Sequence, residues 1–350
     1  MSGLGNGHSI RKRKFKARGG AELAFSELGF GAAPLGNLYR PMTEKEARAT
    51  LDMAWSQGAR YYDTAPLYGL GLSETRINGF LRAKPRDSFV LSTKVGRLLK
   101  VCPPAEKSRP NAFFETPSRK EVFDYSRDGV LRSLEFSLER LGVDHIDVVY
   151  AHDVDVFTHG SAEAADIAIR EFMSGGYRAL AELREQGVIK AFGAGINEWQ
   201  IAERLAREGD FDVFLLAGRY TLLEQEALTS FLPLCIEKQI GVVIGGPFNS
   251  GILATGPKPG AFYNYAPAPK EILDRVRAIE TVCKAHGAKL AEAALRFPLS
   301  HPAIVSIIPG GQRASEVRRN AEMLQAKLPA ALWRDLKAQG LLRADAPTPR

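Results

Sequence analysis

Four side chains that can hold or move a proton follow short apolar segments in the first half of the chain. Asp63 lies within the segment Tyr61–Ala65, Tyr68 follows shortly after it, and Lys94 and His152 belong to the next two such segments. Free tyrosine has a pKa of about 10, too high for ready proton exchange at neutral pH, and a neighbouring cation lowers it. We therefore expect Lys94, paired with Asp63, to lower the pKa of Tyr68. Tyr68 would then act as a general acid/base, with His152 orienting the same substrate oxygen.

This chemistry also needs a cofactor. No protein side chain accepts a hydride, so an oxidoreductase with this set of residues would use a nicotinamide. Each residue alone is more often structural, and only their combination favours an active site. Two glycine-rich stretches, Gly29–Pro34 and Gly69–Glu74, fail to complete G-x-G-x-x-G. We therefore expect no Rossmann-type dinucleotide site.

The rest of the chain alternates short apolar runs with amphipathic helical segments. The expected strands are Leu28–Ala33, Tyr61–Ala65, Phe89–Val95, His145–His152, Ile189–Gly195, Val213–Gly218, Gly241–Gly246 and Ile304–Pro309. The expected helices are Thr43–Gln57, Ser73–Arg82, Arg127–Leu141, Tyr177–Gln186, Glu198–Arg207, Gln225–Lys238, Lys270–His286 and Ser315–Ala326, with an extra one at Ala331–Leu341. Eight strand–helix units in one series predict an α/β fold of the (β/α)8 TIM-barrel type. A doubly wound sheet is the alternative.

Two long segments interrupt this alternation. Arg97–Ser126 and Phe248–Pro269 each follow an expected strand, so they lie at the face where barrel enzymes carry their active sites. Long loops in compact domains are more often functional than not.

Charge and composition limit the alternatives. The chain has 350 residues and a formal net charge of +7, and residues 1–20 carry six Lys and Arg residues without one acid. We expect a basic, flexible arm over 1–20, a single barrel domain over 21–350, and neither a nucleic-acid nor a membrane partner. The three cysteines lie far apart, which indicates a reducing, cytoplasmic compartment and no zinc ribbon.

Three motifs together resemble those of the aldo-keto reductase family. They are Asp63–Gly69, Ser92–Val95 and Tyr150–His152, and the likeness extends from about Leu28 to Asn320. The resemblance implies a TIM barrel, NAD or NADP as cofactor, and Asp63, Tyr68, Lys94 and His152 as the catalytic residues. Within the family, Leu35–Tyr39, Tyr125–Val130 and Phe248–Gly251 resemble bacterial members that oxidise aldoses such as L-fucose or D-threo sugars to lactones. Members that oxidise pyridoxal to its lactone with NAD are equally similar.

The resemblance also implies a cofactor site. Asn197 would hold the nicotinamide carboxamide, Arg219 stands near the family's usual glutamine, and Phe248 would replace an aromatic whose place Gly245 takes. The loop that opens the last barrel helix would bind the adenosine phosphate. Glu316 and Gly310 stand where NADP-specific members carry cations, which favours NAD, while Arg313 favours NADP. The full set of expected cofactor residues is Asn197, Arg219, Phe248, Ser250, Gly251, Pro309, Gly310, Arg313, Glu316 and Asn320.

Substrate and alternatives remain open at this point. Tyr39, Phe113 and Phe114 are candidate walls for a small sugar-like or pyridoxal-like substrate. A non-catalytic NADP-binding subunit, like the family's potassium-channel β-subunits, would carry the same motifs. A metal-dependent barrel enzyme could use His152, Asp153 and Asp155 as ligands, but no second histidine lies at a matching strand end, so we expect no metal. The oligomeric state is undetermined.

Overall fold

The barrel is built from eight parallel strands. The computed structural model describes residues 10–109 and 112–349. In order around the barrel the strands are β3 (Phe30–Gly31), β4 (Tyr61–Asp63), β5 (Val90–Val95), β8 (Val148–His152), β9 (Ala191–Ile196), β10 (Val213–Ala217), β11 (Gly241–Gly245) and β14 (Ile304–Ile308). The ring closes because Leu28 pairs with Ile307, whose carbonyl accepts the Gly29 N–H at 2.9 Å. The predicted TIM barrel is confirmed.

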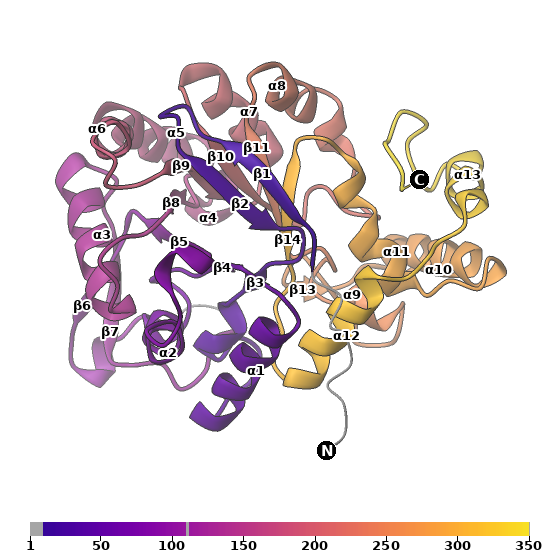
Figure 1. The fold of residues 1–350 in the computed structure, drawn as a ribbon, viewed down its shortest axis with the longest axis horizontal. Helices are drawn as coiled ribbons and strands as arrows, with labels where there is room; N and C mark the ends of the chain where they lie inside the picture. The colour runs from indigo at the N-terminus through magenta and orange to yellow at the C-terminus, as the bar shows by residue number, and fades with distance from the viewer. Residues whose placement is uncertain (1–9, 110–111, 350) are drawn as a thin grey trace.

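Helices surround the strands (Figure 1). They are α1 (Glu44–Ser56), α2 (Leu72–Leu81), α3 (Arg127–Leu141), α6 (Tyr177–Glu185), α7 (Trp199–Glu208), α8 (Phe231–Glu237), α10 (Lys270–Ala285), α12 (Ala314–Leu324) and α13 (Ala330–Ala338). Local chemistry fixes several ends: Thr43 and Glu46 form a reciprocal capping box at α1. Gly142, with φ of 59°, ends α3 in the left-handed conformation.

The helix that follows β8 is longer than predicted. Helix α5 (Ala162–Glu171) runs through a π-helical turn at Phe172–Gly176 into α6, so the predicted start at Tyr177 is too late. Gly175 and Gly176 suggest a break in the sequence, but here they allow close packing instead. A Cβ on Gly175 would lie 2.7 Å from the backbone nitrogen of Arg127. Helix α11 (Leu290–Arg296) was also not predicted.

Both long insertions fold back on themselves above the carboxyl ends of the strands. The first forms the antiparallel hairpin of β6 (Arg97–Val101) and β7 (Arg119–Phe123). The second contains the short helix α9 (Ile252–Thr255) and a small hairpin of β12 (Phe262–Tyr263) and β13 (Ala266–Pro267). The predicted position of the insertions beside the functional face is therefore the one observed.

The opposite end of the barrel is covered by the N-terminal segment. Strand β1 (Lys12–Lys16) pairs with β2 (Glu22–Ser26), and this hairpin lies across the barrel in Figure 1. Phe15 and Phe25 pack against apolar side chains of the barrel interior. The expectation of a flexible arm over 1–20 is wrong from Lys12 onward, because alternate side chains of β1 are half-buried. Residues 1–9 lie outside the described part of the chain.

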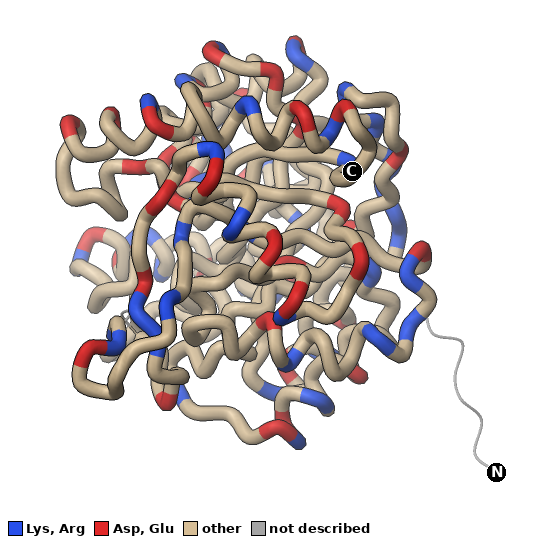
Figure 2. The backbone as a smooth tube through the Cα atoms, turned by 90° about the vertical axis from the view of Figure 1, so that its left-hand side faces the viewer, with Lys and Arg blue, Asp and Glu red and all other residues tan. Residues whose placement is uncertain are grey.

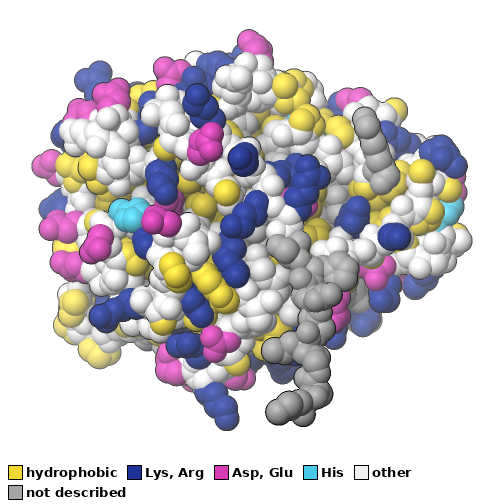
Figure 3. All heavy atoms as spheres, in the orientation of Figure 1, with side chains coloured by type: hydrophobic (Ala, Val, Ile, Leu, Met, Phe, Trp, Pro, Cys, Tyr) yellow, Lys and Arg dark blue, Asp and Glu magenta, His cyan; other side chains and the backbone are white. Residues whose placement is uncertain are grey.

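Arg13 fastens this hairpin to the last barrel strand. Its guanidinium donates to Glu27 at 2.8 Å and to the carbonyl oxygens of Ile304 at 2.7 Å and Leu299 at 2.5 Å. Lys12, Lys14 and Lys16 point outward, and basic side chains cross the centre of this face in Figure 3. Four of the six positive charges that the sequence suggested for a flexible arm therefore lie on the folded strand β1.

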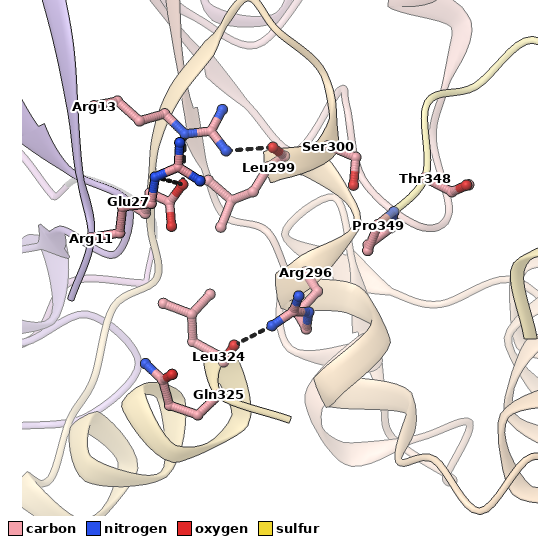
Figure 4. Close-up of a pocket in the computed structure, with 10 residues that line it drawn as sticks. All are labelled: Arg11, Arg13, Glu27, Arg296, Leu299, Ser300, Leu324, Gln325, Thr348 and Pro349. Atoms are coloured by element: carbon pink, nitrogen blue, oxygen red, sulfur yellow. Dashed lines mark hydrogen bonds and ion pairs between the residues drawn. The ribbon is translucent and has the colours of Figure 1, made fainter. Parts of the chain in front are cut away.

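A hollow of about 530 Å³ lies beside the hairpin, between α11 and the C-terminal segment (Figure 4). Arg11, Arg13 and Arg296 line it together with Glu27. Elsewhere acidic and basic residues are intermixed along the chain (Figure 2). Among the described residues, the structure has no helix long and apolar enough to cross a membrane.

Candidate active site

A buried ion pair lies at the carboxyl ends of β4 and β5. The Lys94 ammonium is 2.7 Å from Oδ2 of Asp63 and donates to the Thr64 carbonyl at 2.9 Å. It also lies 3.1 Å from the hydroxyl oxygen of Tyr68. Ser92 donates to the other oxygen of Asp63 at 2.7 Å. Each charged group therefore has several partners, as a buried ion pair requires.

The turn that carries Tyr68 is held by a close backbone approach. A Cβ on Gly69 would lie 2.4 Å from the carbonyl oxygen of Gly36, and Gly69 has φ of 65°. Only glycine tolerates both conditions. This contact packs the Tyr68 turn against the short helical turn Ala33–Gly36. In this position the phenol oxygen of Tyr68 points at the Lys94 ammonium.

The pKa of Tyr68 differs from expectation. Burial raises the pKa of Tyr68 above its ordinary value, and the Lys94 ammonium opposes this shift without cancelling it. The expectation that Lys94 lowers the pKa below the ordinary value is wrong for this structure, because the loss of hydration outweighs one cation. Burial acts to lower the pKa of Lys94 itself, but Asp63 and Tyr68 raise it overall. Lys94 is therefore charged and Tyr68 protonated at neutral pH.

His152 ends β8 beside the phenol. The rings of Tyr68 and His152 are 6.1 Å apart and nearly perpendicular, at 88°. Burial, followed by Arg97 and Lys94, holds the pKa of His152 well below its usual range, so the imidazole is neutral. Its Nε2 lies 3.2 Å from Oδ2 of Asp153, while Nδ1 has no partner among the described residues. The proton therefore sits on Nε2, which makes this atom a hydrogen-bond donor.

Asp153 and Arg97 complete the site; the sequence suggested Asp153 only as a candidate metal ligand and did not indicate Arg97. Arg97 pairs with Asp153 at 2.5 Å and with Glu121 at 2.7 Å, and its side chain is 7% exposed. Asn197 donates to the second oxygen of Asp153 at 3.1 Å. Because Arg97 follows Lys94 closely along the chain, its position could have been suspected; its partner could not.

A cavity of about 730 Å³ extends from Asp63 and Tyr68 to the N-terminal end of α12. Eight of the expected cofactor residues line it: Arg219, Phe248, Ser250, Gly251, Pro309, Gly310, Glu316 and Asn320. Arg313 is not among its lining residues and instead precedes α12 as the N-cap. Lys284, Lys289 and Arg319 line the cavity and were not predicted.

The walls of this cavity fit a dinucleotide. Gly245 lies in its wall, and a Cβ there would meet Leu215 at 3.1 Å, so the wall beside the barrel is flat. Glu316 accepts the N–H of Gln312 at 2.8 Å, which holds its carboxylate at the start of α12. A carboxylate in this place suits ribose hydroxyls, and the nearby cations suit phosphates.

Asn197 is not among the residues that line the cavity, whereas Arg219 lines it and contacts Asn197. The side-chain amide of Asn197 donates to Asp153 and Asp155, and the backbone carbonyl oxygen of Asn197 accepts a hydrogen bond from Arg219 Nε at 2.7 Å. Arg219 also donates to Asn264 at 2.5 Å, at the tip of the β12–β13 hairpin. Arg219 thus joins that hairpin to the barrel.

Aromatic residues surround the phenol. Phe113 stacks on Tyr68 with centroids 6.2 Å apart, and Tyr39 lines the cavity. Phe114 is 47% exposed and packs less closely than expected for a pocket wall. Tyr265 lines the cavity and was not predicted. Its φ of 64° places it in the tight turn of the β12–β13 hairpin.

The residues suggested as metal ligands have other partners. Asp155 accepts the Thr158 N–H at 3.0 Å and the Asn197 N–H at 2.7 Å. Asp153 pairs with Arg97. These contacts turn both carboxylates toward protein donors.

Comparison with known proteins agrees with this geometry. Residues 27–339 match the aldo/keto reductase family. A D-threo-aldose 1-dehydrogenase of a Pseudomonas species is 42% identical over 95% of this chain and 98% of its own length. A pyridoxal 4-dehydrogenase of Microbacterium luteolum is 41% identical over 95% of this chain and 99% of its own. The solved holo structure of an aldo-keto reductase from Bacillus halodurans superposes with a TM-score of 0.71 at 25% identity, covering 96% of this chain and 98% of that one.

The barrel and its site thus define an NAD(P)-dependent oxidoreductase. The chain belongs to the aldo/keto reductase family.

Proposed function

We propose that this protein oxidises the hemiacetal carbon of an aldose, such as L-fucose or a D-threo sugar, to a lactone. The observation that carries the proposal is the contact of the Tyr68 hydroxyl with the buried Lys94 ammonium, 3.1 Å away, beside a neutral His152. A relative 42% identical is named for D-threo-aldose 1-dehydrogenase activity. An enzyme of this kind needs a proton-exchanging group and a hydrogen-bond donor at one substrate oxygen.

The residues have distinct roles in this reaction. The anomeric carbon gives up a hydride, its hydroxyl gives up a proton, and the new carbonyl makes the lactone. Bound oxidised nicotinamide would supply the hydride acceptor. Burial keeps most of the Tyr68 hydroxyl protonated at neutral pH, so the proton is taken by the minor phenolate form, which Lys94 stabilises. Asp63 keeps Lys94 in place. His152 carries one ring proton, on Nε2, and would donate it to the same oxygen in place of its contact with Asp153.

We further propose NAD over NADP. Glu316 lines the adenosine end of the cavity, and its carboxylate would repel a 2′-phosphate. Arg313, which would favour the phosphate, is not among the lining residues, although Arg319 is. Asn197 and Phe248 are assigned to the nicotinamide end, Asn197 through its side-chain amide oxygen and Phe248 as an aromatic residue that lines the cavity.

Pyridoxal is the second candidate substrate. A relative 41% identical is named pyridoxal 4-dehydrogenase. Pyridoxal forms an internal hemiacetal, so its oxidation to 4-pyridoxolactone is the same chemistry. Tyr39 and Phe113 offer aromatic faces that suit a sugar ring and a pyridine ring equally.

A substrate panel tests these proposals. L-fucose, a D-threo aldose and pyridoxal are each supplied with NAD and with NADP, and the reduced cofactor is followed by absorbance. We expect turnover of an aldose with NAD above that with NADP. Faster turnover of pyridoxal than of every sugar would reverse the substrate order. Cofactor binding without turnover of any of the three would indicate a non-catalytic NADP-binding subunit.

A further inference from the structure

Asp153 occupies an unusual position for a carboxylate. It follows β8 directly and has φ of 54°, a left-handed conformation that side chains other than Gly, Asn and Asp rarely adopt. Its backbone N–H donates to the Gly195 carbonyl at 2.9 Å, which holds this turn against β9. The turn directs the carboxylate back toward His152, where Oδ2 reaches Nε2 at 3.2 Å.

The Asp153 carboxylate is held by neighbouring side chains but keeps an acceptor position without a hydrogen-bond donor. Oδ2 meets Arg97 and His152, and Oδ1 meets Asn197. A carboxylate offers about four acceptor positions, so the hydrogen bonds from Arg97 and Asn197 leave room for another. The side chain is 13% exposed, so part of the carboxylate is open to a small molecule, although Asp153 is not among the residues that line the 730 Å³ cavity.

The β6–β7 insertion supplies the charge that keeps Asp153 in place. Arg97 begins β6, and Glu121 on β7 holds its other side at 2.7 Å. An insertion with only a scaffolding role has no need of a buried guanidinium that pairs with a strand-end carboxylate. The pairing places a fixed negative charge next to the atom that binds the reacting oxygen.

We propose that Asp153, held by Arg97 and Asn197, forms a hydroxyl-binding subsite. It accepts a hydrogen bond from the substrate hydroxyl on the carbon next to the reactive centre. The proposal rests on the proposed function and specifies its substrate class: hemiacetals or aldehydes that carry such a neighbouring hydroxyl. The 2-hydroxyl of an aldose meets this requirement, whereas the ring hydroxyl of pyridoxal lies one carbon further from its reactive carbon.

The subsite works only while Asp153 is ionised. Burial raises the pKa of Asp153 to about 6, and Arg97 limits the rise. The other charged or titratable groups that act on Asp153, or on which it acts, are Lys94, Asp155, Tyr68, Tyr125, Tyr265 and His152. His152 is neutral across this range. Recognition of the hydroxyl is therefore strong above pH of about 6 and weakens below it.

The test compares an aldose with its 2-deoxy counterpart. In the wild-type protein we expect kcat/KM to fall by about 10- to 100-fold for the 2-deoxy sugar, the effect of one hydrogen bond to a charged group. In Asp153→Asn the two sugars should differ by less than about threefold, because the charged acceptor is gone. Glu121→Gln, which disturbs Arg97 from its other side, should keep the wild-type ratio.

A second measurement needs no variant. The ratio of kcat/KM for the aldose to kcat/KM for the 2-deoxy sugar is measured in the wild-type protein from pH 8 to pH 5. We expect this ratio to decrease as the pH falls below about 6. Two outcomes overturn the subsite while the proposed function stands. One is a kcat/KM ratio of the aldose to its 2-deoxy counterpart near one in the wild-type protein at pH 8. The other is a ratio in Asp153→Asn as large as in the wild type. Absence of turnover with both sugars overturns the proposed function. Calorimetric binding of the two sugars, which needs no turnover, then decides on the subsite.

Discussion

The ammonium of Lys94 and Oδ2 of Asp63 lie 2.7 Å apart, and both side chains are only 2% exposed. Neither charge can be stabilised by water in this place. The pair is therefore both the electrostatic support of Tyr68 and a weak point of the fold, since loss of one partner leaves the other buried alone.

Lys94→Met should lower the free energy of unfolding by about 3–5 kcal/mol, because Asp63 loses its counter-ion. The double variant Lys94→Met with Asp63→Asn should recover much of this loss while remaining inactive. Urea denaturation measures both. Arg48→Met, which breaks the exposed pair with Asp52, is the control and should change stability by about 0.5 kcal/mol or less. Equal effects of Lys94→Met and Arg48→Met would contradict the pairing.

Tyr68→Phe should reduce kcat by about 10²- to 10⁴-fold, because the proton-exchanging group is lost. The affinity for the cofactor should change little, since the hydroxyl bonds to Lys94. Stopped-flow absorbance gives the rate, and quenching of protein fluorescence by the cofactor gives its Kd. Parallel loss of rate and cofactor affinity would assign Tyr68 a structural role.

Glu316→Gln should improve kcat/KM with NADP by about tenfold, because the repulsion of a 2′-phosphate is removed. The amide oxygen can still accept the Gln312 N–H, now 2.8 Å from the carboxylate. Glu322→Gln, on the exposed side of α12, is the matched control and should leave the NAD-to-NADP ratio as it is. An unchanged ratio in both variants would remove Glu316 from cofactor selection.

His301 should make stability depend on acid. Burial lowers the pKa of His301 to about 4. Between about pH 6.5, its ordinary pKa, and about pH 4 only the unfolded chain takes up the proton, so stability decreases as pH falls through this window. His301→Asn keeps an acceptor for the Ala303 N–H, which lies 3.2 Å from Nδ1. Urea denaturation at pH 7 and pH 5 should show a smaller decrease for this variant than for the wild type.

Arg13→Met should lower the free energy of unfolding by about 1–3 kcal/mol, because two carbonyl oxygens and Glu27 lose a charged donor. Lys12→Met, one residue away on the exposed face of β1, should stay within about 0.5 kcal/mol. Thermal and urea denaturation compare the two. Similar small effects of both substitutions would mean that the hairpin is not fastened to the barrel in solution.

The barrel could be predicted from the sequence because each strand and helix is encoded locally. Helix α3 was predicted with its observed ends, since its apolar residues recur at helical spacing and Gly142 follows. The Lys94–Asp63 contact followed from the order of the strands. In contrast, Arg97 and Asp153 are 56 residues apart, and the insertion that carries Arg97 has no repeating pattern. Such a contact depends on tertiary packing alone.

Two errors have local explanations. The pKa of Tyr68 depends on how completely the ring is dehydrated, and burial of a turn residue is not encoded by spacing. The N-terminal hairpin did carry a signal: Gly19 and Gly20 separate two alternating segments, and Gly20 has φ of 85°. The density of positive charge in β1 masked this pattern.

The hairpin fastened by Arg13 has a consequence for biosynthesis. Its anchoring carbonyls at Leu299 and Ile304 leave the ribosome 286 and 291 residues after Arg13. Until then Phe15 and Phe25 have no completed barrel to pack against, and they stay accessible to chaperones or to other nascent chains. Slow translation of the segment between Arg13 and Ile304 should therefore increase aggregation.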